Sequence, residues 1–355
     1  MKIVLALVVL ITLSSCITVT QSQTSGFLPR HGHAAATSGT GIVVMAGSNG
    51  MDPWTEFRYD FLVRDFVASS DGISWTPVMP QGFFYGVGAE ALTDSGAIVA
   101  SGGAFSPPGD NSGVPTFDSF VYRSSDGGSS WQGRASVPDG LNHFGFVSFQ
   151  GKCWILGGNK GVADLSLPYS ASNMRLSNAI YSLGSSDTTW TQVLPNAADP
   201  SRWSPRDGHA VVVFQNKLWV FGGRGTVEDP STGNTELRSL GDAWSSPDGV
   251  HWTFEAQSGD STRWEALGRA FHQVVALNGA LYLIGGIDQS PKYRFDVPAA
   301  HNDIQRSLNG RTWETVATFP GARFDHTATV MGNSFYILGG RDASQVFSDV
   351  VKCTP

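Results

Sequence analysis

Regularly spaced arginines are the residues of this chain whose type and position could bind a ligand. Four arginines stand three residues before a histidine: Arg30, Arg206, Arg269 and Arg323. Two more, Arg224 and Arg341, directly follow a glycine pair. Tyr85, Asn142 and Asn159 occupy comparable places where the arginine is missing. A guanidinium group binds oxyanions through parallel hydrogen bonds. These nine residues are the predicted ligand-binding set, suited to carboxylates, sulfated or sialylated sugars, or an acidic peptide.

A structural role for the same residues is the open alternative. An arginine that recurs once per repeat unit can pair with an aspartate or a carbonyl oxygen in its own unit. The histidines that follow four of the arginines, His33, His209, His272 and His326, are predicted to be hydrogen-bonded core residues. Four imidazoles from four different units are not expected to converge on one metal ion. We therefore predict no metal site and no cofactor.

An internal repeat positions these residues. Apolar segments that end in a glycine pair recur six times, with the first residue of each pair at 46, 102, 157, 222, 285 and 339. Four of these positions follow a histidine by 13 residues. Each unit is predicted to form four strands, with a short turn after the first and an Asp-Gly type turn before a fourth strand that carries tryptophan. Six such units fill residues 27–352.

This pattern resembles the kelch repeats of the galactose oxidase and kelch superfamily. It departs from them at Ala46, which replaces a glycine, and in the second unit, which lacks both the arginine and the histidine. The resemblance implies an all-β fold, a six-bladed β-propeller of four-stranded kelch-type blades that forms one domain over residues 16–355.

Strand direction decides which face of such a propeller could bind a ligand. The segments that follow the glycine pairs must share one face with the loops that enter each first strand; they are residues 48–64, 104–117, 159–177, 224–241 and 287–302. The other face receives only short turns. Long, varied loops on a rigid scaffold are where binding residues concentrate. The binding site is therefore predicted on the first face, here named the long-loop face, and not on the opposite short-turn face.

The first residues predict export. Lys2 is followed by an apolar run over residues 3–13 and then by small residues, the pattern of a secretory signal peptide over residues 1–15. Residues 13–16 also resemble the bacterial lipobox, in which the cysteine carries a lipid. We therefore predict a secreted or extracytoplasmic protein that is bound to a membrane only if Cys16 is lipid-anchored.

The last unit lacks a fourth strand. The β-branched residues 17–21 are the natural donor, so an N-terminal strand is expected to close the last blade. Antiparallel pairing would bring residue 16 near residue 353, where Cys16 and Cys353 could form a disulfide. Lipidation, a disulfide and two incidental thiols all stay open, because one sulfur atom cannot carry both modifications. Cys153 lies in an apolar strand and is expected to pack in the core.

Composition narrows the possible partners. The chain has 355 residues and a net charge of −7, with no basic run. Such an acidic chain is a poor candidate for nucleic-acid binding, which depends on clustered positive charge. We predict a monomer whose partner is a protein or an acidic glycan.

Two functions remain open. The first is a non-catalytic protein- or glycan-binding module that acts through the long-loop face. The alternative is a carbohydrate-active enzyme such as a sialic acid mutarotase or a sialidase-like hydrolase, because exported six-bladed mutarotases are similar and residues 124–131 fit the Asp-box turn of sialidases. Its acid and base would come from Glu90, Asp207 or Asp325. The copper ligands of galactose oxidase and the Arg-Ile-Pro segment of sialidases have no match here.

Overall fold

The structure is a computed structural model that describes most of the chain beyond residue 16. The described residues are 17–23, 26–39, 41–51, 61–78, 86–105, 116–117, 120–137, 140–162, 173–228, 233–257, 268–288 and 299–355. Their extended elements are all strands, which confirms the all-β prediction. Within these ranges, no helix is long and apolar enough to cross a membrane.

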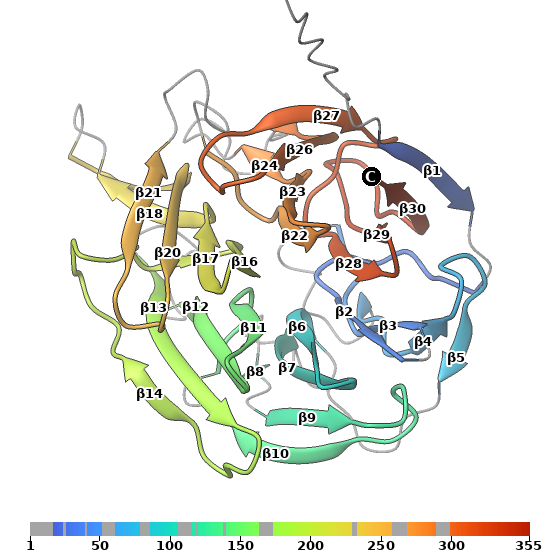
Figure 1. Cartoon of the computed structure of the whole chain (residues 1–355), viewed down its shortest axis with the longest axis horizontal. Helices are drawn as coiled ribbons and strands as arrows, with labels where there is room; N and C mark the ends of the chain where they lie inside the picture. Colours follow the sequence, from blue (N-terminus) through green and yellow to red (C-terminus); the bar gives the residue numbers. More distant parts are fainter. Residues whose placement is uncertain are drawn as a thin grey trace, which may run out of the picture.

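Six large antiparallel sheets, here called blades one to six in chain order, surround a central axis (Figure 1). Their innermost strands are β2 (Ala34–Ser38), β6 (Val87–Asp94), β11 (Gly145–Phe149), β16 (Ala210–Phe214), β22 (Gln273–Leu277) and β28 (Thr327–Met331). Each innermost strand contacts the innermost strands of both neighbouring blades, and β28 contacts β2, so the circle is closed. This arrangement is the predicted β-propeller.

Three further strands follow outward in each blade. The second strands are β3 (Gly41–Met45), β7 (Ala97–Phe105), β12 (Lys152–Val162), β17 (Lys217–Phe221), β23 (Ala280–Ile284) and β29 (Ser334–Leu338). The third strands are β4 (Phe66–Ser69), β9 (Phe120–Ser124), β13 (Met174–Gly184), β20 (Asp242–Ser246), β26 (Asp303–Ser307) and β30 (Asp349–Thr354). The outermost strands are β5 (Thr76–Val78), β10 (Gln132–Ser136), β14 (Thr191–Leu194), β21 (Thr253–Gln257), β27 (Glu314–Thr318) and β1 (Thr18–Gln23).

Short accessory strands extend three blades. They are β8 (Thr116–Phe117), β15 (Arg206–Asp207), β18 (Arg224–Glu228), β19 (Thr235–Ser239), β24 (Ile287–Asp288) and β25 (Ala299–Ala300). β8 pairs with β7, while β15, β18 and β19 form one small sheet and β24 and β25 another.

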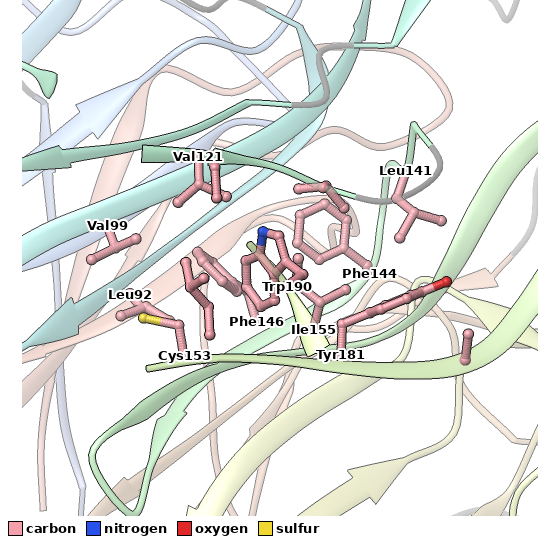
Figure 2. Packing of buried hydrophobic residues seen from close by; sticks show 14 residues of the cluster. Leu92, Val99, Val121, Leu141, Phe144, Phe146, Cys153, Ile155, Tyr181 and Trp190 are labelled. Atoms are coloured by element: carbon pink, nitrogen blue, oxygen red, sulfur yellow. The ribbon is translucent and has the colours of Figure 1, made fainter. Parts of the chain in front are cut away.

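Apolar side chains fill the space between neighbouring blades. Figure 2 shows one such interface, where Leu92, Val99 and Val121 of blade two pack against Ile155 and other residues of blade three. Cys153 belongs to this cluster and is 3% exposed, which confirms its predicted packing role. The free energy that holds neighbouring blades together therefore comes largely from burial of apolar surface between sheets.

Turns on the short-turn face pack against the preceding blade in blades one, two, four and five. In blade one, Asp71 accepts hydrogen bonds from the backbone N–H groups of Ile73 and Ser74, at 2.7 and 2.8 Å. A Cβ atom at the left-handed Gly72 would lie 2.3 Å from the ring of Tyr336 in blade six, so only glycine fits there. The same hydrogen bonds recur at residues 246–251 and 307–312. Residues 124–131, which fit the Asp-box pattern, form a similar turn, in which Asp126 accepts a hydrogen bond from the backbone N–H of Ser130 at 2.9 Å.

The amino-terminal strand closes the propeller as predicted. β1 pairs antiparallel with β30 and supplies the outermost strand of blade six. The register differs from the expected one, because Val19 and not residue 16 lies opposite Cys353. Cys353 is fully buried, and burial raises the pKa of its thiol to about 12. Cys16 lies outside the described residues, so its lipidation and its disulfide stay predictions.

Candidate functional site at the mouth of the central channel

A closed circle of six backbone hydrogen bonds surrounds the axis on the long-loop face. Its members, here called the ring residues, are Gly32, Gly88, His143, Gly208, Phe271 and Asp325. Each donates its N–H to the carbonyl oxygen of the ring residue in the preceding blade, over 2.7 to 3.0 Å, and Gly32 donates to Asp325. All six have the left-handed backbone conformation, with φ between 48° and 71°. The circle therefore demands the same unusual conformation once in every blade.

Three ring residues are not glycine. His143, Phe271 and Asp325 have φ values of 48°, 53° and 56°, where an L-residue costs roughly 1–2 kcal/mol relative to an ordinary conformation. Glycine meets the same requirement at the other three positions without that cost. A non-glycine residue kept in a strained conformation that glycine would adopt without strain is a common mark of a functional position. The three side chains stand at the entrance of the channel, here called the mouth.

Two histidines surround the carboxylate of Asp325. His31 lies 2.8 Å from Asp325 Oδ2 through Nδ1, and its Nε2 donates to the carbonyl oxygen of Gly50 at 2.8 Å. His143 Nδ1 lies 3.7 Å from Asp325 Oδ1, across the axis from blade three to blade six. Burial alone would raise the pKa of Asp325, but His143, His31 and Arg341 outweigh it and hold that pKa below its ordinary value. Asp325 is therefore an anion at neutral pH.

The Asp325 carboxylate should make the free energy of unfolding depend on pH in the acidic range. Because the folded pKa is lowered, its contribution is complete above the unfolded value near 4 and is lost as pH falls toward the folded value. Asp325→Asn keeps the shape and tolerates the left-handed conformation. Urea unfolding at pH 2 to 6 should show a shallower loss of stability in this variant than in the wild type. Parallel curves would contradict the assignment.

Aromatic rings and guanidinium groups border the same opening. The guanidinium of Arg224 lies 5.0 Å from the ring centroid of Phe271, and that of Arg341 lies 5.1 Å from the centroid of Phe324. His143 meets Phe271 edge to face, with ring centroids 5.2 Å apart. Cation–aromatic contacts of this kind hold the two guanidinium groups in fixed orientations. The mouth therefore combines cations, aromatic surface and one carboxylate.

Comparisons with known proteins agree with this architecture, although no family model matches the chain. It is 28% identical to Host cell factor 2 of Homo sapiens over 220 residues, which cover 58% of this chain and 25% of that protein. It is 26% identical to Kelch domain-containing protein 3 of Rattus norvegicus over 202 residues, covering 54% and 45%. The solved structure of YjhT superposes with a TM-score of 0.67 at 15% identity and covers 93% of this chain and 96% of that one. The chain is a kelch-repeat β-propeller. It spans less than half the length of these two curated relatives.

Four of the predicted ligand residues of this kelch propeller lie inside its blades. Arg30, Arg206, Arg269 and Arg323 are all 0% exposed. Each pairs with an aspartate at the start of, or just before, the third strand of its own blade; the partners are Asp65, Asp242, Asp303 and Asp349. Each also donates to the carbonyl oxygen sixteen residues ahead, at the first position of the glycine pair. Burial and pairing leave these guanidinium groups no surface for a ligand, so the geometry favours the structural alternative.

Four other predicted residues do gather around the mouth. Backbone bridges join Asn142 to Asn159 and Asp207 to Arg224, and Arg341 is bridged to the residue before Asp325. Arg224 donates to both oxygens of the buried Asp207, at 3.0 and 2.6 Å, and Asn159 donates to the same carboxylate at 3.2 Å. The remaining predicted residue, Tyr85, lies outside the described residues. The predicted set thus divides into a structural half and a half at the mouth.

The prediction missed the ring residues His143 and Phe271 and their neighbour His31. A signal for the ring residues was present, because each lies 14 residues before the first position of a glycine pair. Aligning the six units at that offset shows glycine in three of them and larger residues in the others. These residues are marked by their departure from the repeat, whereas the predicted arginines are marked by their recurrence in it.

The four histidines before the first strands of the kelch propeller are core residues, as predicted. The predicted hydrogen bond is present at His209, whereas within the described residues both ring nitrogens of His33 and His326 have no hydrogen-bond partner. His33, His209, His272 and His326 are at most 6% exposed, and burial lowers the pKa of each. His209 illustrates their place, since its Nε2 lies 3.0 Å from the carbonyl oxygen of Leu156 in the preceding blade. Its pKa falls to about 3, so it is neutral at physiological pH. Among the described residues, no three His, Cys, Asp or Glu side chains are placed to hold a metal ion.

Proposed function

We propose that the protein is a binding module that recognises a protein partner, or an acidic glycan, at the channel mouth. The kelch-repeat relatives support a binding role for the propeller. One observation supports the location: His143, Phe271 and Asp325 keep strained conformations at positions where glycine serves equally well in the other blades. The backbone circle does not need these side chains. Their role therefore lies with whatever approaches the long-loop face.

The chemistry of the mouth suits an acidic ligand. Arg341 lies partly exposed on an aromatic ring, Arg224 is 8% exposed and bound to Asp207, and His31 and His143 surround the carboxylate of Asp325. A guanidinium held in place loses less entropy when it binds an oxyanion than a mobile one does. We also propose that the chain is exported, on the evidence of its amino-terminal sequence, and that it acts as a monomer.

Substituting a ring residue by glycine should separate binding from folding. His143→Gly removes the imidazole and relieves the left-handed strain, so its melting temperature should stay equal to or above that of the wild type. Binding to arrays of acidic peptides and of sialylated and sulfated glycans should fall at least tenfold. Gln150→Gly is the matched control, because Gln150 has φ 50° in a turn on the short-turn face. Equal binding by wild type and His143→Gly would contradict the proposal.

A carbohydrate-active enzyme is the second candidate, which the position of His143 favours. Its imidazole is 14% exposed at the mouth, with Asp325 beside Nδ1 to orient it, as a general base requires. Glu90 lines the pocket directly below. Asp207, also considered as an acid or base, is 0% exposed and held by Arg224, which removes it from such a role. The main chemistry would therefore rest on His143, Asp325 and Glu90.

A sialic acid anomerisation assay beside the glycan array distinguishes the two candidates. Binding without turnover supports the module, and turnover that is lost in His143→Gln supports the enzyme. Turnover that persists unchanged in His143→Gln would contradict the assignment of His143.

A further inference from the structure

A polar cavity lies in the channel beneath the ring residues. Six equivalent positions follow the ring residues by two; they are Ala34, Glu90, Gly145, Ala210, Gln273 and Thr327. Three are small, and the other three line a cavity of about 130 Å³ together with Val211 and other inner-strand residues. Glu90 comes from blade two and Gln273 from blade five, which stand on opposite sides of the axis (Figure 1).

The pair formed by His143 and Asp325 stands between this cavity and the mouth. Both residues line a smaller pocket of about 30 Å³ at the level of the ring, which Glu90, Gln273 and Thr327 also line. That volume admits about one water molecule. A solute that reaches the cavity from the long-loop face therefore passes His143 and Asp325.

Two polar side chains face the cavity with their bonding capacity unused. Within the described part of the chain, neither the Glu90 carboxyl nor the Gln273 amide forms a hydrogen bond or an ion pair with another residue. Thr327 donates its hydroxyl proton to the carbonyl oxygen of His33 at 2.8 Å, which leaves its oxygen lone pairs available. Burial, and then the charge of Asp325, raise the pKa of Glu90 well above its ordinary value. Both side chains are partly exposed within the channel, and a bound species that uses their free lone pairs would stabilise the fold.

We propose that this cavity is a binding site for one monovalent cation, either an alkali ion or ammonium. The oxygen atoms of Glu90, Gln273 and Thr327 are the ligands that hard cations prefer. One carboxylate balances one positive charge, whereas a divalent ion held in protein usually needs more. The volume accommodates the ion with a few water molecules, each of which takes about 30 Å³.

In the proposed binding reaction, the cation replaces the proton of the Glu90 carboxyl. A protonated Glu90 carboxyl must lose its proton to solvent as the cation enters, so such a site gains one ion, releases one proton and keeps its net charge. Affinity must therefore rise with pH until Glu90 is ionised without the cation. The negative charge of Asp325 acts on this carboxyl, and it attracts the ion as it repels ionised Glu90.

Thermal unfolding of the full chain tests the site. The protein is melted at constant ionic strength and pH 7.5 in chloride salts of sodium, potassium, ammonium and N-methyl-D-glucamine, the last being too large for the cavity. At a concentration ten times the Kd, the fitting cation should raise the melting temperature by about 2 °C over N-methyl-D-glucamine. The difference should shrink at pH 6, where more protons compete for Glu90.

Two variants keep the test specific. Glu90→Gln should abolish the difference between cations and the uptake of base that accompanies ion binding in unbuffered solution. Glu314→Gln, a carboxylate 67% exposed on β27, should preserve both. Equal melting temperatures in all four salts would mean that the cavity holds only water and would overturn the proposal. A cation effect that survives in Glu90→Gln would place the ion elsewhere.

Discussion

Arg206→Met should lower the free energy of unfolding by about 3–5 kcal/mol, the effect of removing one partner from a buried ion pair. The guanidinium of Arg206 is 0% exposed and bonds both oxygens of Asp242, the carbonyl oxygen of Gly222 and Ser204. Without it, the largely buried Asp242 carboxylate, 19% exposed, keeps the hydrogen bond from Trp244 Nε1 at 2.8 Å but loses its compensating positive charge. Equilibrium unfolding in guanidinium chloride measures the loss.

Two further variants test the reason for this loss. Arg306→Met is the control, because Arg306 forms a long 3.5 Å contact with the exposed Glu314, and such a pair contributes at most about 1 kcal/mol. Asp242→Asn combined with Arg206→Met should lose less than the sum of the two single variants. If Arg206→Met instead melted like the wild type and only failed to bind acidic ligands, the ligand-contact interpretation of this arginine would be restored.

Deleting residues 1–23 should open blade six and make Cys353 reactive. β1 covers β30, Ile17 and Val19 pack against the apolar cluster that contains Cys353, and Gln21 donates to Asp349 at 2.6 Å. Without β1 the edge of β30 is exposed, which invites aggregation and lowers stability. The thiol pKa of about 12 should fall toward its ordinary value, so the rate of iodoacetamide labelling at pH 8 should rise roughly a hundredfold.

The matched control removes residues 1–16 and keeps β1. This shorter deletion should label as slowly as the full chain, since it leaves the pairing of Thr18 through Gln23 intact. Slow labelling and an unchanged melting temperature after the longer deletion would show that closure does not depend on β1.

The architecture followed from the sequence because the glycine pairs mark a backbone requirement. At Gly223, with φ 100°, a Cβ atom would lie 2.6 Å from that of His209, so the residue type reports the crowding directly. The closing strand could also be predicted from the sequence, because a missing strand leaves a sheet edge that some segment must cover. The register of this strand could not be predicted, since the pattern of residue types allows either Val19 or residue 16 to lie opposite Cys353.

The spacing of the arginines in the sequence could not predict where each side chain lies in the fold. Arg206 and Arg224 lie within one blade, yet the first reaches outward to Asp242 while the second lies at the mouth over Phe271. A long side chain can turn either way from a strand, and the choice depends on which carboxylate the third strand presents. Both aspartates that decide it, Asp207 and Asp242, are visible in the sequence, but their partners are not.

The direction of β1 determines which face of the propeller would point away from a surface to which the amino end is attached. Thr18 pairs with Thr354, whose hydroxyl contacts Ser334 beside the tight turn between β28 and β29. The chain therefore enters the propeller at the rim opposite the channel mouth. A lipid on Cys16, or a bead coupled to the amino end, would hold the underside close and leave the cations and aromatic rings pointing outward, open to partners arriving from the surrounding medium.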